Sequence, residues 1–215
     1  GARNNDWEDI DLAPCPSEPG DCLYIADTGD NNRRRNDVDI YVVPEPDPTH
    51  GASDSVTSSE PAMRIEVRYP RGRSWDVEAL AVDSAGNILL ISKGRSRGIN
   101  LFRVRADGLD EHRVDAEWIR RLPILPLRNL GRWVTGAAVS PSGTRLVVRT
   151  YNEMFFFDLA AGILEPEPLA CWIGAVEPQG EAVDFLDEHR VILLSESVPN
   201  NPGTVFEATC DETSQ

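Results

Sequence analysis

Four short segments of one kind recur along the chain and align without gaps. They occupy residues 8–12, 78–82, 135–139 and 181–185, and each has the length of a strand made of small and apolar residues. Three of them begin with Glu and the other begins with Thr. A repeat unit of several tens of residues indicates a fold that stacks copies of one supersecondary unit.

A second apolar strand follows each marker segment and ends at a polar residue. These polar ends are Asp27, Lys93, Thr150 and Glu196, and the last three lie fifteen residues after their markers. The first repeat is longer by four residues, and the excess lies between Cys15 and Cys22. Turn sequences such as Ser140-Pro141-Ser142-Gly143 join the two strands, which predicts tight antiparallel hairpins.

A third strand and a more polar fourth strand complete most repeats, as at residues 100–104 and 64–69. Four antiparallel strands with a buried inner pair describe the blade of a β-propeller. We therefore expect residues 1–215 to form a single all-β domain, a β-propeller with about four visible repeats. The ring has five or more blades if an N-terminal blade is missing, or a second chain supplies the missing blade.

Two local expectations accompany this fold. Asp115–Arg121 is the best candidate for a helix, because Pro123 and Pro126 would stop it shortly afterwards. The Ser- and Pro-rich stretch from Asp47 to Pro61 is predicted to be an exposed loop.

The four cysteines match no zinc pattern, since no C-x-x-C is present and no histidine lies close to a cysteine. Cys15 and Cys22 flank a strong turn, so a disulfide across that hairpin is geometrically natural, and Cys171 and Cys210 would form the second bridge. Four free thiols are the alternative. Disulfides require an oxidising compartment, which predicts a secreted or periplasmic protein whose targeting segment is removed or left out.

A formal net charge of −15 and a pI of about 4.6 repel phosphate backbones, so nucleic acid is a poor candidate partner. No stretch reaches the roughly 20 apolar residues of a membrane helix, so we expect no membrane span. The acidic surface favours cations or serves solubility.

The marker residues Glu8, Glu78, Thr135 and Glu181 recur once per blade, so we expect them to form a ring at one height around the propeller axis. Gathered carboxylates repel one another unless a cation neutralises them or they share protons. Oxygen ligands alone suit Ca²⁺, or with less support Mg²⁺. Alternatively, each Glu caps backbone amides of a neighbouring blade.

A second set of axial candidates mixes signs: Asp27, Lys93, Arg149, Thr150 and Glu196. These residues either contact the ligand or form salt bridges with the Glu ring. The loop from Asp27 to Asn32 is the best single metal candidate, with Asp27, Asp30 and Asn31 as ligands, because closely spaced oxygens around a Gly can converge on one ion. An acidic β-turn is the rival interpretation.

Gly94–Gly98 matches the G-x-S-x-G pattern of a hydrolase nucleophile. That motif needs a strand-to-helix turn and a histidine placed to take the proton. Here the pattern lies between two predicted strands and the three histidines fall in predicted loops. A glycine-rich blade turn is the better interpretation.

Three stretches carry a family resemblance: Asn5-Asp6-Trp7-Glu8-Asp9-Ile10, Tyr24 to Asn31, and Ile40 to Pro46. They resemble a family of exported bacterial propellers close to the phytase-like and esterase-like propellers. The resemblance covers the first fifty residues in motif and most of the chain in pattern. It implies a secreted, monomeric propeller that in some members binds calcium, and it carries over no catalytic residue.

Two functions follow from these features. The first is a binding module whose acidic, calcium-loaded axial site recognises a small molecule or a protein partner. The second is a metal-assisted, phytase-like hydrolase of a phosphoester or lactone, in which Lys93 and Arg149 steady the developing anion. An acidic ring with few bases is a poor host for phosphate, so the sequence favours the binding module.

Overall fold

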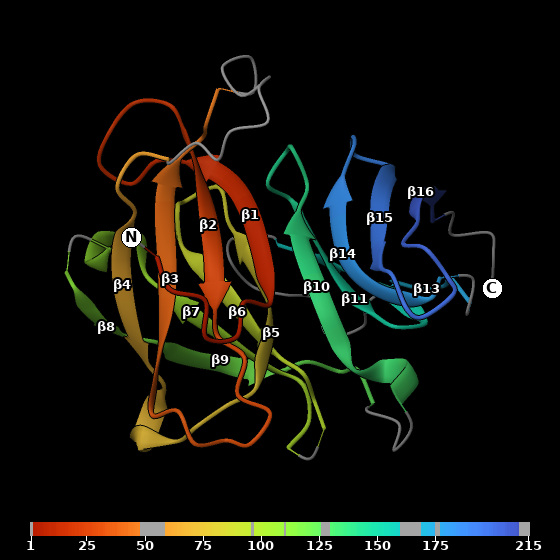
Figure 1. Cartoon of the computed structure of the whole chain (residues 1–215), viewed down its shortest axis with the longest axis horizontal. Coiled ribbons are helices and arrows are strands. Elements are labelled where there is room, and N and C mark those ends of the chain that lie inside the picture. The colour runs from red at the N-terminus through yellow and green to blue at the C-terminus, as the bar shows by residue number, and fades with distance from the viewer. Residues whose placement is uncertain are drawn as a thin grey trace.

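The computed structural model describes residues 2–47, 59–95, 97–109, 111–125, 130–159, 169–174 and 177–210. Within these ranges the chain folds into four sheets, antiparallel except for the pairing of β4 with β8, and contains only three short 3₁₀ turns, at Pro70–Gly72, Ala106–Gly108 and Leu130–Arg132. Figure 1 shows the sheets side by side, with their first strands toward the centre. The predicted all-β propeller fold is confirmed.

The blades follow the chain order. Blade 1 contains β1 (Asp9–Pro14), β2 (Asp21–Asp27), β3 (Asp37–Pro44) and β4 (Met63–Arg68), and β8 (Arg113–Asp115) adds to β4 in parallel. Blade 2 contains β5 (Val77–Val82), β6 (Ile88–Ser92), β7 (Asn100–Val104) and β9 (Glu117–Arg121). Blade 3 contains β10 (Val134–Val139), β11 (Arg145–Thr150), β12 (Glu153–Asp158) and β13 (Leu169–Trp172). Blade 4 contains β14 (Gln179–Phe185), β15 (Arg190–Glu196) and β16 (Val205–Thr209).

The helix predicted at Asp115–Arg121 is wrong, because this segment forms the end of β8 and the whole of β9. Strand β9 pairs with β7 and completes blade 2. The Trp118 indole N–H donates to Asn100 Oδ1 over 3.1 Å, which ties the outer strand to its neighbour. Tertiary pairing therefore outweighs the local helix signal. Most of the predicted loop from Asp47 to Pro61 lies outside the described residues.

Glycines set the hairpins between inner strands, as the turn sequences predict. Gly86 and Gly143 have φ of 79° and 73°, a region that residues with a side chain rarely adopt. Each turn is closed by a backbone hydrogen bond, from Gly86 to Asp83 and from Gly143 to Ser140. These tight turns fix the register of β5 with β6 and of β10 with β11.

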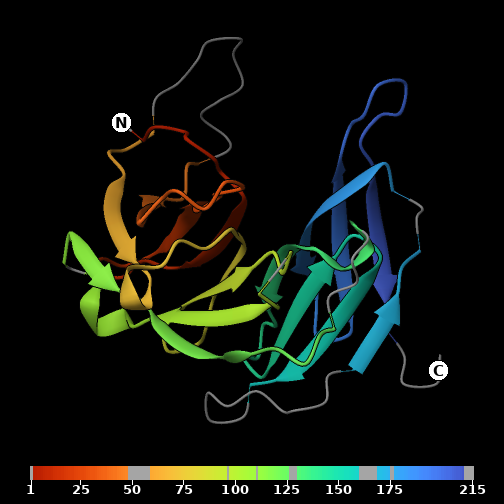
Figure 2. The same ribbon diagram turned by 90° about the horizontal axis from the view of Figure 1, so that it is seen from below.

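Three apolar clusters hold the blades together, each formed between one blade and the next. The first joins blades 1 and 2 through Ile40 and Leu80, and the second joins blades 2 and 3 through Ile91 and Phe155. The third joins blades 3 and 4 through Phe156 and other residues. Figure 2 shows the blades as an arc, with blade 1 and blade 4 at its ends.

Carboxylates of β1 complete the contact between the inner strands. Asp9 Oδ2 accepts the backbone N–H of Leu80 at 2.9 Å and of Ala137 at 3.3 Å, so one side chain bridges blades 1, 2 and 3. Asp11 Oδ2 accepts the N–H of Val82 at 2.7 Å. The first strand of each blade has no neighbouring strand on its inner edge, so amides on that edge lack strand partners. The two carboxylates accept the amides of Leu80, Val82 and Ala137 on these edges.

Both predicted disulfides are present. Cys15 pairs with Cys22 across the β1–β2 hairpin with 4.9 Å between Cα atoms, and Cys171 pairs with Cys210 with 6.0 Å. The second bridge fastens β13 of blade 3 to the segment after β16 of blade 4. Two disulfides fit a protein exposed to an oxidising compartment. In the described part of the chain, no helix has the length and apolarity needed to cross a membrane.

The bridging role of Asp9 predicts a stability effect that an ordinary surface aspartate lacks. Asp9→Ala leaves the amides of Leu80 and Ala137 without an acceptor and should lower the free energy of unfolding by about 1–3 kcal/mol in urea titration. Asp9→Asn keeps an acceptor oxygen and should recover most of the loss. Asp158→Ala, at an exposed strand end, is the control. Equal effects of Asp9→Ala and Asp158→Ala would contradict the bridging role.

Candidate functional site

The four marker residues lie at the starts of the four inner strands. Glu78, Thr135 and Glu181 belong to β5, β10 and β14, and Glu8 directly precedes β1, with its N–H donating to the Ala26 carbonyl at 2.9 Å. Strand β5 packs against both β1 and β10, and β10 packs against β14. The markers therefore lie at the same end of neighbouring inner strands, as a ring around the axis requires.

Glu78 and Lys93 form a buried ion pair beside this axis. Lys93 Nζ donates to Glu78 Oε2 over 2.5 Å, and the two residues are only 7% and 3% exposed. The Lys93 backbone is fixed on both sides, since its N–H donates to Asp76 and its carbonyl accepts the N–H of Val134. The pair thus lies where blade 2 meets blade 3. Lys93, one of the axial candidates of mixed charge, is therefore in direct contact with the marker Glu78.

Glu8 enters the same region from blade 1. A Cβ at Gly29 would collide with the carboxylates of Glu8 and Asp6, so this glycine leaves the space that the two acids occupy. Burial raises the pKa of Glu8 to about 9, and the nearby negative charges of Glu78 and Asp6 add to the rise while Lys93 opposes it. Glu8 therefore carries a proton at neutral pH.

Burial also raises the pKa of Glu78, to about 7, although Lys93 opposes the rise. Asp76 contributes to the increase through its own carboxylate. Two carboxyl groups that face each other in a buried place need a proton or a cation between them. The axial cluster of Glu8, Asp76 and Glu78 is thus short of positive charge even with Lys93 present.

Blade 4 contributes Glu181, which accepts a hydrogen bond of 2.7 Å from Gln179 Nε2. The same amide donates to Glu196 at 3.2 Å, so the two glutamates share one donor. Burial raises the pKa of Glu181, and the charge of Glu196 adds to the rise. Glu196, a member of the second set, therefore lies beside the ring.

Tyr151 connects these parts. Burial raises the pKa of its hydroxyl to about 12, with further increases from the negative charges of Glu181, Glu78 and Glu196. The pKa of this one phenol is therefore affected by carboxylates of both blade 2 and blade 4. This places Glu78 and Glu181 in a common electrostatic environment.

Two buried oxygen atoms of the ring lack hydrogen-bond partners among the described residues. They are Glu78 Oε1 and Thr135 Oγ1, in residues that are 3% and 2% exposed. A buried polar atom without a partner costs about 1–3 kcal/mol. Both atoms can serve as ligands to a hard cation or as acceptors for a donor group.

Arg149 and Thr150 have different roles from the ring. Arg149 is fully buried between blades 3 and 4, where it forms an ion pair with Glu177 and donates to the carbonyls of Ala182 and Leu194. The Thr150 hydroxyl donates to the Glu153 carbonyl at 3.1 Å. The Arg149 contacts fasten blade 3 to blade 4 and leave its Nε without a partner among the described residues, whereas the Thr150 contact lies within blade 3.

The loop after β2 is held together by its own acids. Asp27 accepts the N–H groups of Asn5 and Asp6 and pairs with Arg35 at 2.9 Å. Asp30 accepts the N–H groups of Arg34 and Arg35 at 2.8 Å. Asn31 is exposed. In these contacts the two carboxylates act as turn caps, while their use as metal ligands stays a prediction.

Three His, Cys, Asp or Glu side chains converge closely at one place in the described part of the chain, at Cys15, Glu18 and Cys22. Both cysteines there are in a disulfide, so their sulfurs are not metal ligands. The axial carboxylates stand farther apart than that group. A cation on the axis would therefore combine a few protein oxygens with water.

Several axial residues were missed at the sequence level: Asp6, Asp76, Trp133 and Gln179. Each lies two positions before a marker, so the repeat itself carries the signal. Trp133 supports the positive side of the site, with Arg95 Cζ 4.4 Å and Lys93 Nζ 5.9 Å from its ring. Such contacts hold a cationic side chain over the aromatic face.

The comparisons with known proteins bear on the fold alone. No family model and no curated protein matches the chain. Among solved structures, it is similar to the PQQ-bound aldose sugar dehydrogenase of Streptomyces coelicolor, with 13% identity and a TM-score of 0.52 over 94% of this chain and 61% of that one. The hydrazine synthase of Kuenenia stuttgartiensis gives 15% identity and a TM-score of 0.46 over 92% and 45%.

A third structure, Hsv2 of Kluyveromyces lactis, gives 9% identity and a TM-score of 0.43 over 94% of this chain and 73% of that one. The chain thus spans about half to three fifths of the first two structures. The resemblance to phytase-like exported propellers gains support at the level of the propeller fold and not at the level of a family.

The buried Lys93–Glu78 pair predicts a strong coupling. Lys93→Met leaves a buried carboxylate without its counter-charge and should lower the free energy of unfolding by about 3 kcal/mol at pH 8. The double variant Lys93→Met, Glu78→Gln should recover much of this loss, because no charge remains uncompensated. Denaturant titration of the four proteins gives the coupling energy. Additive effects would contradict a direct pair.

The raised pKa of Glu8 predicts an unusual pH dependence. The folded protein holds a proton that the unfolded chain releases above about pH 4.5, so the contribution of Glu8 to stability is lost as pH rises toward 9. The unfolding temperature should rise on acidification from pH 9 to pH 6. Glu8→Gln should flatten this slope and raise stability most at pH 9. The exposed Glu45→Gln should leave the slope unchanged, and a slope unaffected by Glu8→Gln would refute the assignment.

Proposed function

We propose that this propeller is a binding module whose site is the axial cluster of Glu8, Glu78, Thr135 and Glu181, and that the site binds a cation. The observation that carries the proposal is the pair of buried, unpartnered oxygens, Glu78 Oε1 and Thr135 Oγ1, beside an excess of carboxylates. A bound cation would partner both oxygens and offset the repulsion that adds to the effect of burial on the pKa values of Glu8 and Glu78.

Ca²⁺ is the ion that this donor set fits best. The candidate ligands are carboxylate and hydroxyl oxygens, and all four cysteines are in disulfides and so supply no thiolate. Calcium accepts irregular sets of six to eight oxygens and tolerates water among them. A set of well-separated carboxylates around an axis suits calcium better than the compact octahedron of Mg²⁺.

The same geometry favours binding over the alternative, metal-assisted hydrolysis. Lys93 is engaged by Glu78, and Arg149 is buried between blades 3 and 4 in contact with Glu177. The two bases assigned to steady an anionic transition state are therefore already neutralised. A small molecule or protein partner with a cationic group is a further class of ligand that the acidic axis would accept.

Binding should be visible as stabilisation. After removal of metal with EDTA, millimolar Ca²⁺ should raise the free energy of unfolding by about 3 kcal/mol at a hundredfold excess over the dissociation constant. Thr135→Val removes one proposed ligand and an unsatisfied buried hydroxyl. It should leave the metal-free protein as stable as the wild type, or more so, and reduce the calcium-induced shift of the melting temperature.

Calcium affinity should also increase from pH 6 to pH 9, because the ion must displace the protons held by Glu8 and Glu78. Isothermal titration in buffers of different ionisation enthalpy measures the protons released. No calcium-induced shift in the wild type at either pH would refute the cation site. An equal shift in Thr135→Val would place the ion elsewhere.

A further inference from the structure

The face of blade 1 that points away from blade 2 carries an apolar residue at the position that, in the other blades, packs against the preceding blade. The residue two positions after each marker is Ile10, Leu80, Ala137 or Val183. Leu80, Ala137 and Val183 are buried in the clusters that join each blade to the one before it. Ile10 occupies the same register and is 52% exposed.

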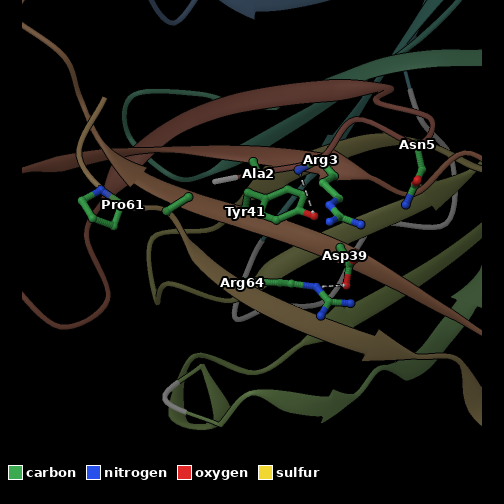
Figure 3. Close-up of a pocket in the computed structure, with 8 residues that line it drawn as sticks. Ala2, Arg3, Asn5, Asp39, Tyr41, Pro61 and Arg64 are labelled. Atoms are coloured by element: carbon green, nitrogen blue, oxygen red, sulfur yellow. Dashed lines mark hydrogen bonds and ion pairs between the residues drawn. The ribbon is translucent and has the colours of Figure 1, made fainter. Parts of the chain in front are cut away.

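Exposed apolar surface continues from Ile10 along blade 1. Leu12 is exposed, and Ile25, which pairs with Ile10, is half-buried. At the outer end of this cross-strand row lie Tyr41 and Arg64, beside a hollow of about 490 Å³. Figure 3 shows Arg3 beside Tyr41 and Arg64 paired with Asp39 there. The face therefore combines an apolar strip with a shallow recess, away from the axial carboxylates.

Blade 4 presents the complementary face. Ala182, Leu194 and Val205 form one cross-strand row. The corresponding row of blade 2, Ala79, Ile91 and Leu101, is buried against blade 3. In blade 4 Leu194 is exposed and Val205 is 65% exposed. None of the three apolar clusters in the described residues joins blade 4 to blade 1.

Asp184 of blade 4 corresponds to an aspartate that, in blade 1, bonds to the next blade. Asp9 and Asp11 each accept their following residue's N–H with Oδ1 and an amide of blade 2 with Oδ2. Asp184 occupies the register of Asp11, and its Oδ1 accepts the N–H of Phe185 in the same way. No donor to its Oδ2 is found among the described residues. Asp184 Oδ2 thus lacks the amide that Oδ2 of Asp9 and of Asp11 accepts.

We propose that the open faces of blade 1 and blade 4 dock against each other between two copies of this chain. Blade 4 of one copy packs against blade 1 of its partner, and the reciprocal contact closes a two-copy ring. Each chain carries both halves of one blade-to-blade interface, and that interface continues the three already formed within the chain. The exposed apolar strips and the free oxygen of Asp184 carry the inference, which departs from the monomer that the family resemblance implies.

Charge decides the conditions under which this contact forms. Each chain has a net charge of −15, so two copies repel each other at low ionic strength. The proposed contact is mainly apolar and does not depend on ion pairs. Added salt should therefore strengthen association by screening the repulsion. An interface made of surface salt bridges would weaken under the same change.

Light scattering after size exclusion tests the proposal directly. In 0.5 M NaCl at tens of micromolar protein, we expect a mass of twice 23.8 kDa. Val205→Lys and Ile10→Lys alter exposed side chains on the two faces and should each weaken association at least tenfold. Leu125→Lys, an exposed apolar position outside both faces, is the matched control. Far-ultraviolet circular dichroism confirms that each variant is folded.

A mixing experiment tests which faces meet. Ile10→Lys blocks the blade 1 face and Val205→Lys blocks the blade 4 face, so a mixture retains one intact junction between unlike copies. The mixture should form mixed dimers although each variant alone is a monomer. Dimers of either variant alone would show a like-with-like contact and overturn the proposal.

A wild-type protein that stays monomeric at 100 µM in high salt would also overturn it. The calcium-dependent stability of Thr135→Val reports on the oxygens of Glu78 and Thr135, which lie in blades 2 and 3 of one chain. A failed association therefore contradicts the docking proposal alone, and an absent calcium-induced shift contradicts the axial site alone.

Discussion

The close approach of the inner strands is the constraint on which the rest of the structure depends. Strands β5 and β10 can come together at the axis because Ala79, Ala81, Ala137 and Ala138 are small and buried. Gly136 likewise lets β10 approach β14 closely, since a Cβ there would lie 2.7 Å from the Glu181 carbonyl oxygen. Close packing of these strands leaves no room for large side chains. It also sets the marker residues at the same end of neighbouring inner strands.

The chemistry of the site follows from that convergence. Carboxylates lie at the starts of three blades, and burial makes the ionised forms of Glu8 and Glu78 costly. Lys93 offsets part of this cost in one direct contact with Glu78. Protonation offsets another part of the cost of burying these carboxylates. The oxygens without a partner, Glu78 Oε1 and Thr135 Oγ1, remain available to bind a ligand.

The blade repeat, the strand order and both disulfides could be predicted from the sequence, because constant spacing between markers reflects one unit repeated in space. The outer strand β9 could not, since the helix signal at Asp115–Arg121 is local and the pairing with β7 is not. The position of the markers at the same end of neighbouring inner strands also followed from register, while their ring around an axis stays a prediction. The engagement of Arg149 with Glu177 did not, because the partner lies in a connecting segment outside the repeat.

Two kinds of acid serve two purposes in this propeller, and register distinguishes them. Asp9 and Asp11, one and three positions after the marker, point between blades and accept amides of the next inner strand. The marker glutamates lie at the starts of the inner strands, where Glu78 pairs with Lys93 and Glu181 accepts from Gln179. A carboxylate between blades, such as that of Asp9, stabilises the fold because it accepts an otherwise unpaired amide. A buried marker glutamate destabilises the fold until a counter-charge is present.

The terminal blades connect these two purposes. Glu8 and Glu181 belong to blades 1 and 4, the same blades whose outer faces are open, so covering those faces would further reduce the water around both carboxylates. Greater desolvation raises the cost of ionised glutamate and also strengthens its attraction to a bound cation. Under the two proposals, association of the faces and occupancy of the axis are linked equilibria, and each changes the other by the same free energy.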